Sequence, residues 1–105
     1  MSVQDVLVKA INAKVPVLAI YKGTERWICP HRIGYKGMSM NLLSYQYAGH
    51  SDSGLGPDGS DVNWRCWNVA DVSSVQIVEG EWHSALVVGV KRSTCVDTVL
   101  AEVAW

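Results

Sequence analysis

The segment from Met40 to Gly49 constrains the fold more than any other part of the chain. It is apolar enough for the central strand of a β-sheet, yet it contains three consecutive residues with polar tips, Tyr45, Gln46 and Tyr47. Successive side chains of a strand point to opposite faces, so we expect Tyr45 and Tyr47 on one face and Gln46 on the other. A sheet built around this strand is therefore predicted to carry a polar, aromatic face.

The N-terminal residues predict one helix. Ser2 is a suitable N-cap, and Asp5 places a negative charge in the first turn. Apolar residues then recur at helical spacing, namely Val3, Val6, Leu7, Ala10 and Ile11. Pro16 disfavours a helical conformation in the residue before it, so we expect the helix over about residues 2–13. A helix of this length is unstable alone, and we expect it to cover one open end or face of the sheet.

Short apolar runs separated by Gly-rich turns follow the helix. The expected strands are residues 17–21, 25–33, 38–48, 62–69, 71–78 and 94–105. Residues 80–92 give no clear assignment, because Gly89 interrupts an apolar run. Pro30 lacks a backbone donor, so its strand should lie at an edge or bend there. The pattern predicts a mainly β fold with five or six strands, and a small barrel over residues 15–105, because closure removes exposed edges.

Length and charge limit the classes of protein that the chain can represent. A chain of 105 residues is expected to form one domain over residues 1–105. Its formal net charge of −1 argues against a main role in coating nucleic acid, although a local basic patch is compatible with that total. No apolar run approaches the ~20 residues that cross a bilayer, and the N-terminus lacks a secretory signal. We therefore expect a cytoplasmic protein without a membrane partner.

Cysteine and aromatic usage give two further expectations. Cys29, Cys66 and Cys95 are odd in number and widely spaced, which argues against a disulfide framework. We expect these three thiols to pack as small hydrophobic groups. The chain has five Trp and four Tyr but no Phe, and Trp and Tyr suit binding faces as well as cores.

No motif predicts catalysis or a metal centre. Cys29 and His31 are two residues apart, but the chain has no Cys-x-x-Cys pair of the kind that marks zinc sites. Ser51 and Ser53 follow His50 without the sharp turn motif that presents a nucleophilic serine. We therefore expect no enzymatic activity, no metal and no cofactor.

Residues 49–61 form the longest predicted loop. They include four Gly, three Ser and three Asp, and a loop of this length is either mobile filler or a working part. Residues 53–59 lack the Lys-Ser/Thr of a phosphate-binding loop, and the aspartates would repel an anion. The aspartates could instead hold a cation weakly, although their spacing matches no known calcium loop.

The remaining candidate site is a basic and aromatic set on the strands. Arginine beside aromatic rings is the composition that grips phosphates and stacks on bases. The same composition also describes a solvated sheet face with cation–π pairs, and both interpretations stay open. The set consists of Arg26, His31, Arg32, Tyr45, Gln46, Tyr47, Trp64 and Arg65.

Several short motifs resemble the WYL-domain family, and more closely its short stand-alone relatives. They are Arg26 with Cys29-Pro30-His31-Arg32-Ile33-Gly34, then Leu42-Leu43-Ser44-Tyr45-Gln46, a Ser/Gly-rich loop, Trp64-Arg65 and Asp71-Val72, within residues 15–79. The resemblance implies an SH3-like (Sm-like) β-barrel that senses ligands in bacterial regulators, with a basic and aromatic pocket for nucleotides or nucleic acid. Carried over by position, that pocket uses His31, Arg32, Tyr45, Gln46, Arg65, Ser51 and Ser53. The Trp-Tyr-Leu signature itself is absent, and about 14 residues before the first strand are too few for a helix-turn-helix.

Together these features predict a non-enzymatic ligand-binding or sensor module. Its expected ligand is a nucleotide, a single-stranded nucleic acid or another anion, and its expected role is an accessory to bacterial transcription regulation or defence. The predicted ligand-binding residues are His31, Arg32, Tyr45, Gln46, Ser51, Ser53, Trp64 and Arg65. The alternative is a structural or homo-oligomer-forming domain without a small ligand, which would associate through surface Trp residues such as Trp82 and Trp105.

Overall fold

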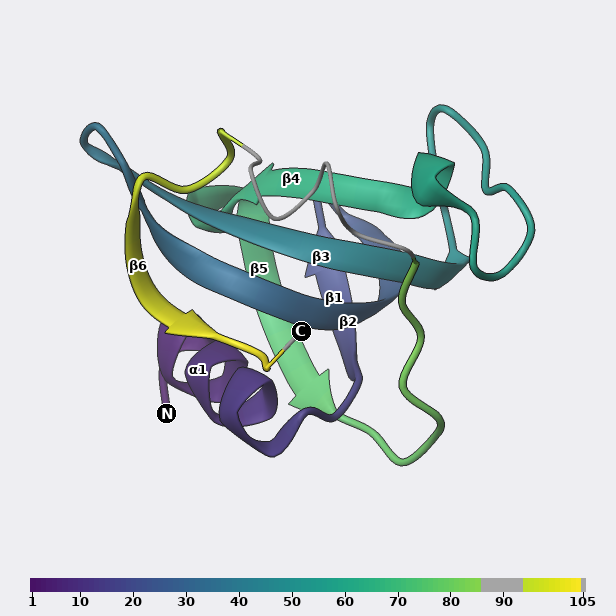
Figure 1. Cartoon of the computed structure of the whole chain (residues 1–105), viewed down its shortest axis with the longest axis horizontal. Helices are drawn as coiled ribbons and strands as arrows, with labels where there is room; N and C mark the ends of the chain where they lie inside the picture. The colour runs from purple at the N-terminus through teal and green to yellow at the C-terminus, as the bar shows by residue number, and fades with distance from the viewer. Residues whose placement is uncertain (86–93, 105) are drawn as a thin grey trace.

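The computed structural model describes residues 1–85 and 94–104, which fold into an antiparallel β-sheet and one N-terminal helix (Figure 1). The elements are α1 (Val3–Ala13), β1 (Val17–Tyr21), β2 (Thr24–Lys36), β3 (Ser39–Gly49), β4 (Trp64–Asn68), β5 (Val72–Ile77) and β6 (Thr98–Glu102). Two short 3-10 helices, η1 (Asp61–Asn63) and η2 (Val69–Asp71), precede β4 and β5. The predicted helix and six strands are confirmed, but the last strand spans Thr98–Glu102 and not the whole of residues 94–105. Of the unassigned stretch 80–92, residues 86–92 lie outside the described residues, as does Trp105.

The helix α1 begins and ends where its local chemistry requires. The Ser2 hydroxyl accepts a hydrogen bond from the Asp5 amide at 3.1 Å, and the Asp5 carboxylate accepts one from the Ser2 amide at 3.3 Å. This capping box satisfies two of the amide groups that a helix start leaves unpaired. At the other end Lys14 adopts the left-handed conformation, and its backbone amide donates to the carbonyls of Ala10 and Ile11 in the last turn. The apolar stripe of α1 is buried against the sheet.

The long strand β2 organises the sheet. The strand order is β4-β3-β2-β1-β5, and β6 also pairs with β2. The first half of β2 pairs with β1, up to Ile28 opposite Val17, and the second half pairs with β6 from Arg32 onward. Pro30 lies between these two halves, next to a register shift in the pairing with β3. Its missing amide hydrogen therefore falls where β2 changes partners, which agrees with the predicted bend.

The predicted closed barrel is wrong, because the sheet curves without closing. The strands at the two ends of the order, β4 and β5, are joined in sequence by η2 and form no ladder with each other among the described strands. Side chains cover the gap instead: the Tyr21 and Trp67 rings stack with their centroids 4.2 Å apart. The backbone amide of Lys22 donates to the carbonyl of Asp71 beside this stack. Side-chain packing thus replaces the last strand pairing.

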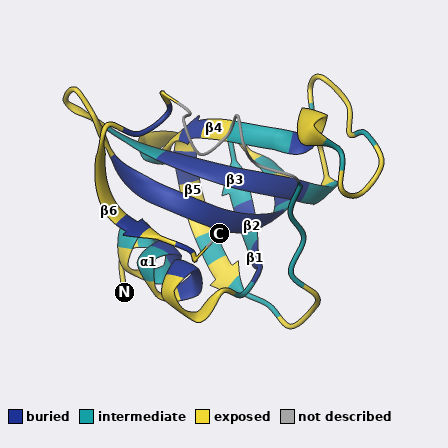
Figure 2. Ribbon diagram, in the orientation of Figure 1, coloured by how far each residue is buried: buried dark blue, intermediate teal, exposed yellow. Residues whose placement is uncertain are grey.

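Both faces of the sheet are covered, as the buried middle parts of β2 and β3 indicate (Figure 2). On one face α1 packs against the larger apolar cluster, which includes Ile28, Ile33 and Leu42. On the other face Leu43, Cys95 and Val96 form a smaller cluster with Trp64 packed against it. Tyr45 and Gln46 are both fully buried, so the middle strand is enclosed from both sides.

Two of the three cysteines form a disulfide, which corrects the prediction of three free thiols. Cys66 on β4 is bonded to Cys95 just before β6, with their Cα atoms 5.8 Å apart. The bond connects positions 29 residues apart, and sequence spacing alone does not reveal that the fold brings them together. Cys29 is free and buried. A disulfide is uncommon in a reducing cytosol, so the cytoplasmic location stays a prediction that this bond does not favour.

Within the described part of the chain, no helix has the length and apolar composition to cross a lipid bilayer.

Candidate functional site

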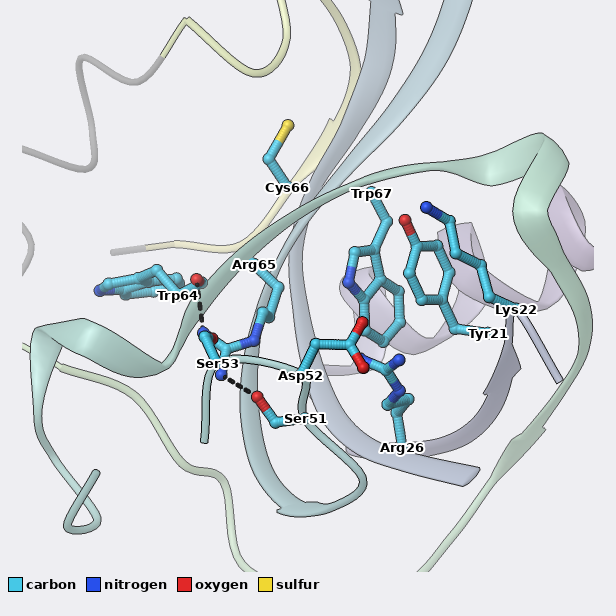
Figure 3. Close-up of a pocket in the computed structure, with 10 residues that line it drawn as sticks. All are labelled: Tyr21, Lys22, Arg26, Ser51, Asp52, Ser53, Trp64, Arg65, Cys66 and Trp67. Atoms are coloured by element: carbon cyan, nitrogen blue, oxygen red, sulfur yellow. Dashed lines mark hydrogen bonds between the residues drawn. The ribbon is translucent and has the colours of Figure 1, made fainter. Parts of the chain in front are cut away.

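One pocket lies where the turn between β1 and β2, strand β4 and the loop after β3 meet (Figure 3). Its volume is about 370 Å³. Figure 3 shows Tyr21, Trp67 and Arg26 gathered on one side of it, with Arg65 and Ser51 on the other. The lining residues are Tyr21, Lys22, Arg26, Ser51, Asp52, Ser53, Trp64, Arg65, Cys66 and Trp67. Four of the eight predicted ligand-binding residues are therefore brought together here: Ser51, Ser53, Trp64 and Arg65.

Arg65 holds the loop that forms one wall of this pocket. Its Nη2 donates to the Ser51 hydroxyl at 2.8 Å and to the Gly54 carbonyl at 3.2 Å. Its Nη1 donates to the carbonyls of Val62 and Trp64, and its Nε donates to Gln46 Oε1. These bonds use all five N–H donors of a guanidinium. Burial is the main cause that lowers the pKa of Arg65, and the nearby charge of Arg26 acts in the same direction. Arg65 thus contributes charge and rigidity to the pocket rather than spare donors.

Arg26 is the most unusual side chain of the pocket. It is only 4% exposed, and its guanidinium lies 5.1 Å from the Tyr21 ring centroid and 5.7 Å from that of Trp67. Its Nε donates to the Thr24 hydroxyl at 2.9 Å. Its two terminal nitrogens make no hydrogen bond or ion pair with the described residues. The ammonium of Lys22 lies over the same Tyr21 ring, at 5.5 Å. Among the described residues, two cations that have donors without a hydrogen-bond partner therefore flank one ring at the pocket.

Asp52 is the carboxylate of the pocket lining. It is exposed and accepts a hydrogen bond from His50 Nε2 at 2.8 Å. That hydrogen bond and the charge of His50 lower the pKa of Asp52, and the charges of Arg26 and Lys22 act in the same direction. Asp52 is thus ionised, and three cationic side chains line the same pocket, namely Lys22, Arg26 and Arg65. The charged lining residues therefore carry a net positive charge.

Tyr45 and Gln46 lie beneath the loop and not at the pocket surface. The Tyr45 hydroxyl donates to the Ser60 carbonyl at 2.8 Å and accepts from Asn63 Nδ2 at 3.3 Å. The Gln46 amide donates to the carbonyls of Ala48 and His50. These two buried side chains fix both ends of the loop, and Tyr45 presents no exposed ring face for stacking.

Arg32 lies elsewhere, in an ion pair between β2 and β6. It is buried, and its Nη2 and Nε donate to Glu102 Oε1 at 2.6 and 3.0 Å. Its charge is therefore matched by a carboxylate of the last strand. Arg32 does not line the pocket.

No protein-family model, curated protein or solved structure matches the chain. The resemblance to the WYL-domain family therefore stays a prediction.

His31 lies on the opposite face of the sheet from the pocket's arginines, between two tryptophans. Its ring centroid is 4.6 Å from that of Trp64 and 4.7 Å from that of Trp82. Its two nitrogens lie within hydrogen-bond distance of the Cys29 carbonyl and the Ser84 hydroxyl. Burial is the main cause that lowers the pKa of His31 to about 4, so the ring is neutral at neutral pH.

The buried neutral His31 predicts a loss of stability in mild acid. The unfolded chain takes up a proton at this histidine below pH 6.5, whereas the folded chain does so only at about pH 4. The contribution of neutral His31 to the free energy of unfolding is therefore fully present above about pH 6.5. It falls as the pH is lowered toward about 4, by up to ~1.4 kcal/mol per pH unit. Urea unfolding of the protein and of His31→Gln at about pH 7.5 and about pH 4.5 measures this contribution. We expect the acid-induced loss to be ~2 kcal/mol smaller in the variant; equal losses would contradict the prediction.

The remaining polar groups do not form a metal centre among the described residues, where no group of three or more His, Cys, Asp or Glu converges. The loop aspartates point to different partners: Asp58 pairs with His83 and Asp52 with His50. The Cys29 thiol accepts a hydrogen bond from the His83 amide, and burial raises its pKa to about 12. Cys29 is therefore protonated at neutral pH and is a poor nucleophile.

Sequence reasoning placed Arg26 in the basic and aromatic set but did not select it as a ligand-binding residue. Lys22, Tyr21 and Trp67 were missed altogether. The signal for Lys22 was its place in the Lys22-Gly23 turn, because a residue in a tight turn is free to project a charge beside a neighbouring strand end. Trp67 carried no such signal, since its stacking on Tyr21 depends on how the sheet curves.

Proposed function

We propose that the chain is a binding module for a small phosphate-bearing ligand. Arg26 and Lys22 bind the phosphate in the pocket between β4 and the β1–β2 turn. The buried guanidinium of Arg26 carries this proposal. A guanidinium that is only 4% exposed, and whose two terminal nitrogens have no hydrogen-bond acceptor among the described residues, is energetically unfavourable. A phosphate supplies the missing acceptors, because its oxygens match the two terminal nitrogens of a guanidinium. Cation–π contacts with the rings of Tyr21 and Trp67 hold that guanidinium at the pocket.

The other lining groups fit the same ligand class. The Lys22 ammonium provides a second cation, and Ser51 and Ser53 provide hydroxyl groups on the opposite wall. A volume of about 370 Å³ is within the range of small-molecule pockets and accommodates a mononucleotide. Trp67 is buried and stacked on Tyr21, so little free ring surface is left for a base. Recognition is therefore expected to depend on the phosphate more than on the base.

The scaffold supports the proposal as well. A strongly curved antiparallel sheet with an N-terminal helix is compatible with the SH3-like fold that the WYL-like resemblance implies. A role as a sensor in bacterial regulation or defence is part of that expectation. The alternative of a homo-oligomer has less support, because Trp82 packs against His31 and the core.

Titration with phosphate-bearing probes tests the function directly. Inorganic phosphate, adenosine monophosphate and a short single-stranded oligonucleotide are titrated separately while tryptophan fluorescence is recorded, because Trp64 and Trp67 line the pocket. We expect a saturable change. Loss of one charge-assisted hydrogen bond in Arg26→Gln or Lys22→Gln is expected to weaken binding ~10-fold to ~100-fold.

Matched variants separate this effect from loss of fold or of general charge. Lys22 is exposed, so Lys22→Gln is expected to remain folded even where Arg26→Gln is destabilised. Lys9→Gln removes an equal charge from the exposed side of α1 and is expected to bind like the unmodified protein. The proposal fails if none of the three probes gives a saturable change, or if Lys22→Gln and Arg26→Gln both bind with unchanged affinity.

A further inference from the structure

A second cavity, of about 240 Å³, shares no lining residue with the pocket that we propose binds phosphate. It lies beside the C-terminal end of α1 and the segments that follow β5 and β6. Its walls are mostly apolar, and it contains one charged side chain, Lys14, among the described lining residues. The lining residues are Lys14, His31, Trp82, Ser84, Ala85, Val103 and Ala104. His31 and Ser84 both open onto this cavity.

The hydrogen bonds of His31 fix which nitrogen carries its proton. Nδ1 lies 2.6 Å from the carbonyl oxygen of Cys29, and a carbonyl only accepts, so Nδ1 must be the donor. Because burial keeps the ring neutral, Nε2 then has a lone pair and no hydrogen. The Ser84 hydroxyl lies 2.9 Å from Nε2 and must therefore donate its proton to it. The direction of both bonds follows from the chemistry of the partners.

This is the arrangement of a nucleophile and its base: a hydroxyl that donates to a neutral imidazole, whose other nitrogen is held by an acceptor. Burial lowers the pKa of His31 to about 4, so the imidazole is a weaker base than an unshifted histidine and turnover is expected to be slow. The contact of 2.9 Å is within the range of nucleophile–base pairs. The Trp64 and Trp82 rings fix the imidazole plane from two sides. We propose that Ser84 and His31 form an acyl-transfer site that cleaves small esters in this second cavity.

The reaction proceeds in two steps, with water as the second reactant. The Ser84 oxygen bonds to the ester carbonyl carbon while its proton passes to Nε2 of His31. The carbon–oxygen bond to the alcohol then breaks, and the alcohol leaves with that proton. Water next attacks the acyl-serine and gives a proton to His31. The acyl–Ser84 bond breaks, the proton returns to Ser84, and the carboxylic acid is released.

The cavity also limits the substrate. Its apolar lining and small volume suit a short, uncharged acyl group. The positive charge of Lys14 is near enough to contribute to the low pKa of His31. The same charge favours the oxyanion that forms when Ser84 attacks the carbonyl. Cys29 supplies only its backbone carbonyl, so its side chain takes no part in the reaction.

Labelling with a small alkyl fluorophosphonate tests the site without knowledge of a natural substrate. Ser84 displaces fluoride from phosphorus, and the adduct is read by intact mass and located by peptide mapping. We expect one adduct per chain on Ser84, none on this site in Ser84→Ala, and at least a tenfold lower labelling rate in His31→Gln. Ser74→Ala removes an exposed serine of β5 that lines neither of the two cavities and is expected to label at the unmodified rate.

Two outcomes would overturn the inference. One is the absence of an adduct on the unmodified protein; the other is equal labelling of Ser84→Ala, whose fold is checked by circular dichroism. Hydrolysis of p-nitrophenyl acetate provides a second readout, with a burst of nitrophenol that disappears in Ser84→Ala. The inference is independent of the proposed phosphate site, because the two cavities share no lining residue.

Discussion

Reducing the disulfide between Cys66 and Cys95 is expected to lower the free energy of unfolding by ~3–4 kcal/mol. The bond closes a loop between residues 29 apart, and in the chain-entropy description such a link restricts the unfolded chain more than the folded one. It joins β4 to the segment that leads into β6. Reduction therefore removes this covalent link and leaves the pairings of the described strands in place.

Urea unfolding with and without dithiothreitol measures this contribution. The double variant Cys66→Ser/Cys95→Ser serves as the control, because it lacks the bond under both conditions. We expect reductant to shift the midpoint of the unmodified protein and to leave that of the double variant unchanged. Coincident midpoints of the oxidised and reduced protein would show that the disulfide does not stabilise the fold.

Replacing Trp67 by alanine is expected to cost ~3–5 kcal/mol of stability. The side chain is 3% exposed and belongs to the main core, and its ring stacks on Tyr21 where the sheet fails to close. Truncation removes the buried apolar area, leaves a cavity and separates the ends of the sheet. It also removes one of the two rings over which the Arg26 guanidinium lies.

Chemical unfolding of Trp67→Ala, Trp67→Phe and Val62→Ala tests this role. Trp67→Phe keeps an aromatic ring and is expected to lose clearly less stability than Trp67→Ala. Val62 is 61% exposed, so Val62→Ala is expected to change stability by no more than ~0.5 kcal/mol. A loss below ~1 kcal/mol in Trp67→Ala would mean that the stack does not hold the ends of the sheet together.

Local patterns in the sequence were sufficient for the elements of the fold. Ser2, Asp5 and Pro16 mark the ends of the helix, and alternation with Gly-rich turns marks the strands, because these signals act over a few residues. Barrel closure was wrongly predicted because it depends on whether β4 and β5 meet, which no local pattern encodes. The disulfide was missed for a related reason: its two cysteines are 29 residues apart in sequence and meet only through the tertiary fold.

The candidate site was predicted in part. Arg65 and Ser51 were selected by motif, and they lie together at the pocket. His31 and Arg32 are adjacent in sequence, but alternation along β2 and its register shift send them to different partners, Ser84 and Glu102. Composition alone cannot tell a guanidinium with spare donors from one that is fully bonded. That distinction between Arg26 and Arg65 required the structure.

The place of Gly34 in β2 bears on the order in which the chain assembles. A Cβ atom there would lie 2.0 Å from the Thr98 carbonyl oxygen, so only glycine lets β6 approach this closely. The ion pair that accompanies this approach joins residues 70 positions apart, and contacts of such long separation form slowly. We expect β6 to dock last and to detach first. The covalent link at Cys95 then acts as a tether that keeps the detached strand at high local concentration and favours its return.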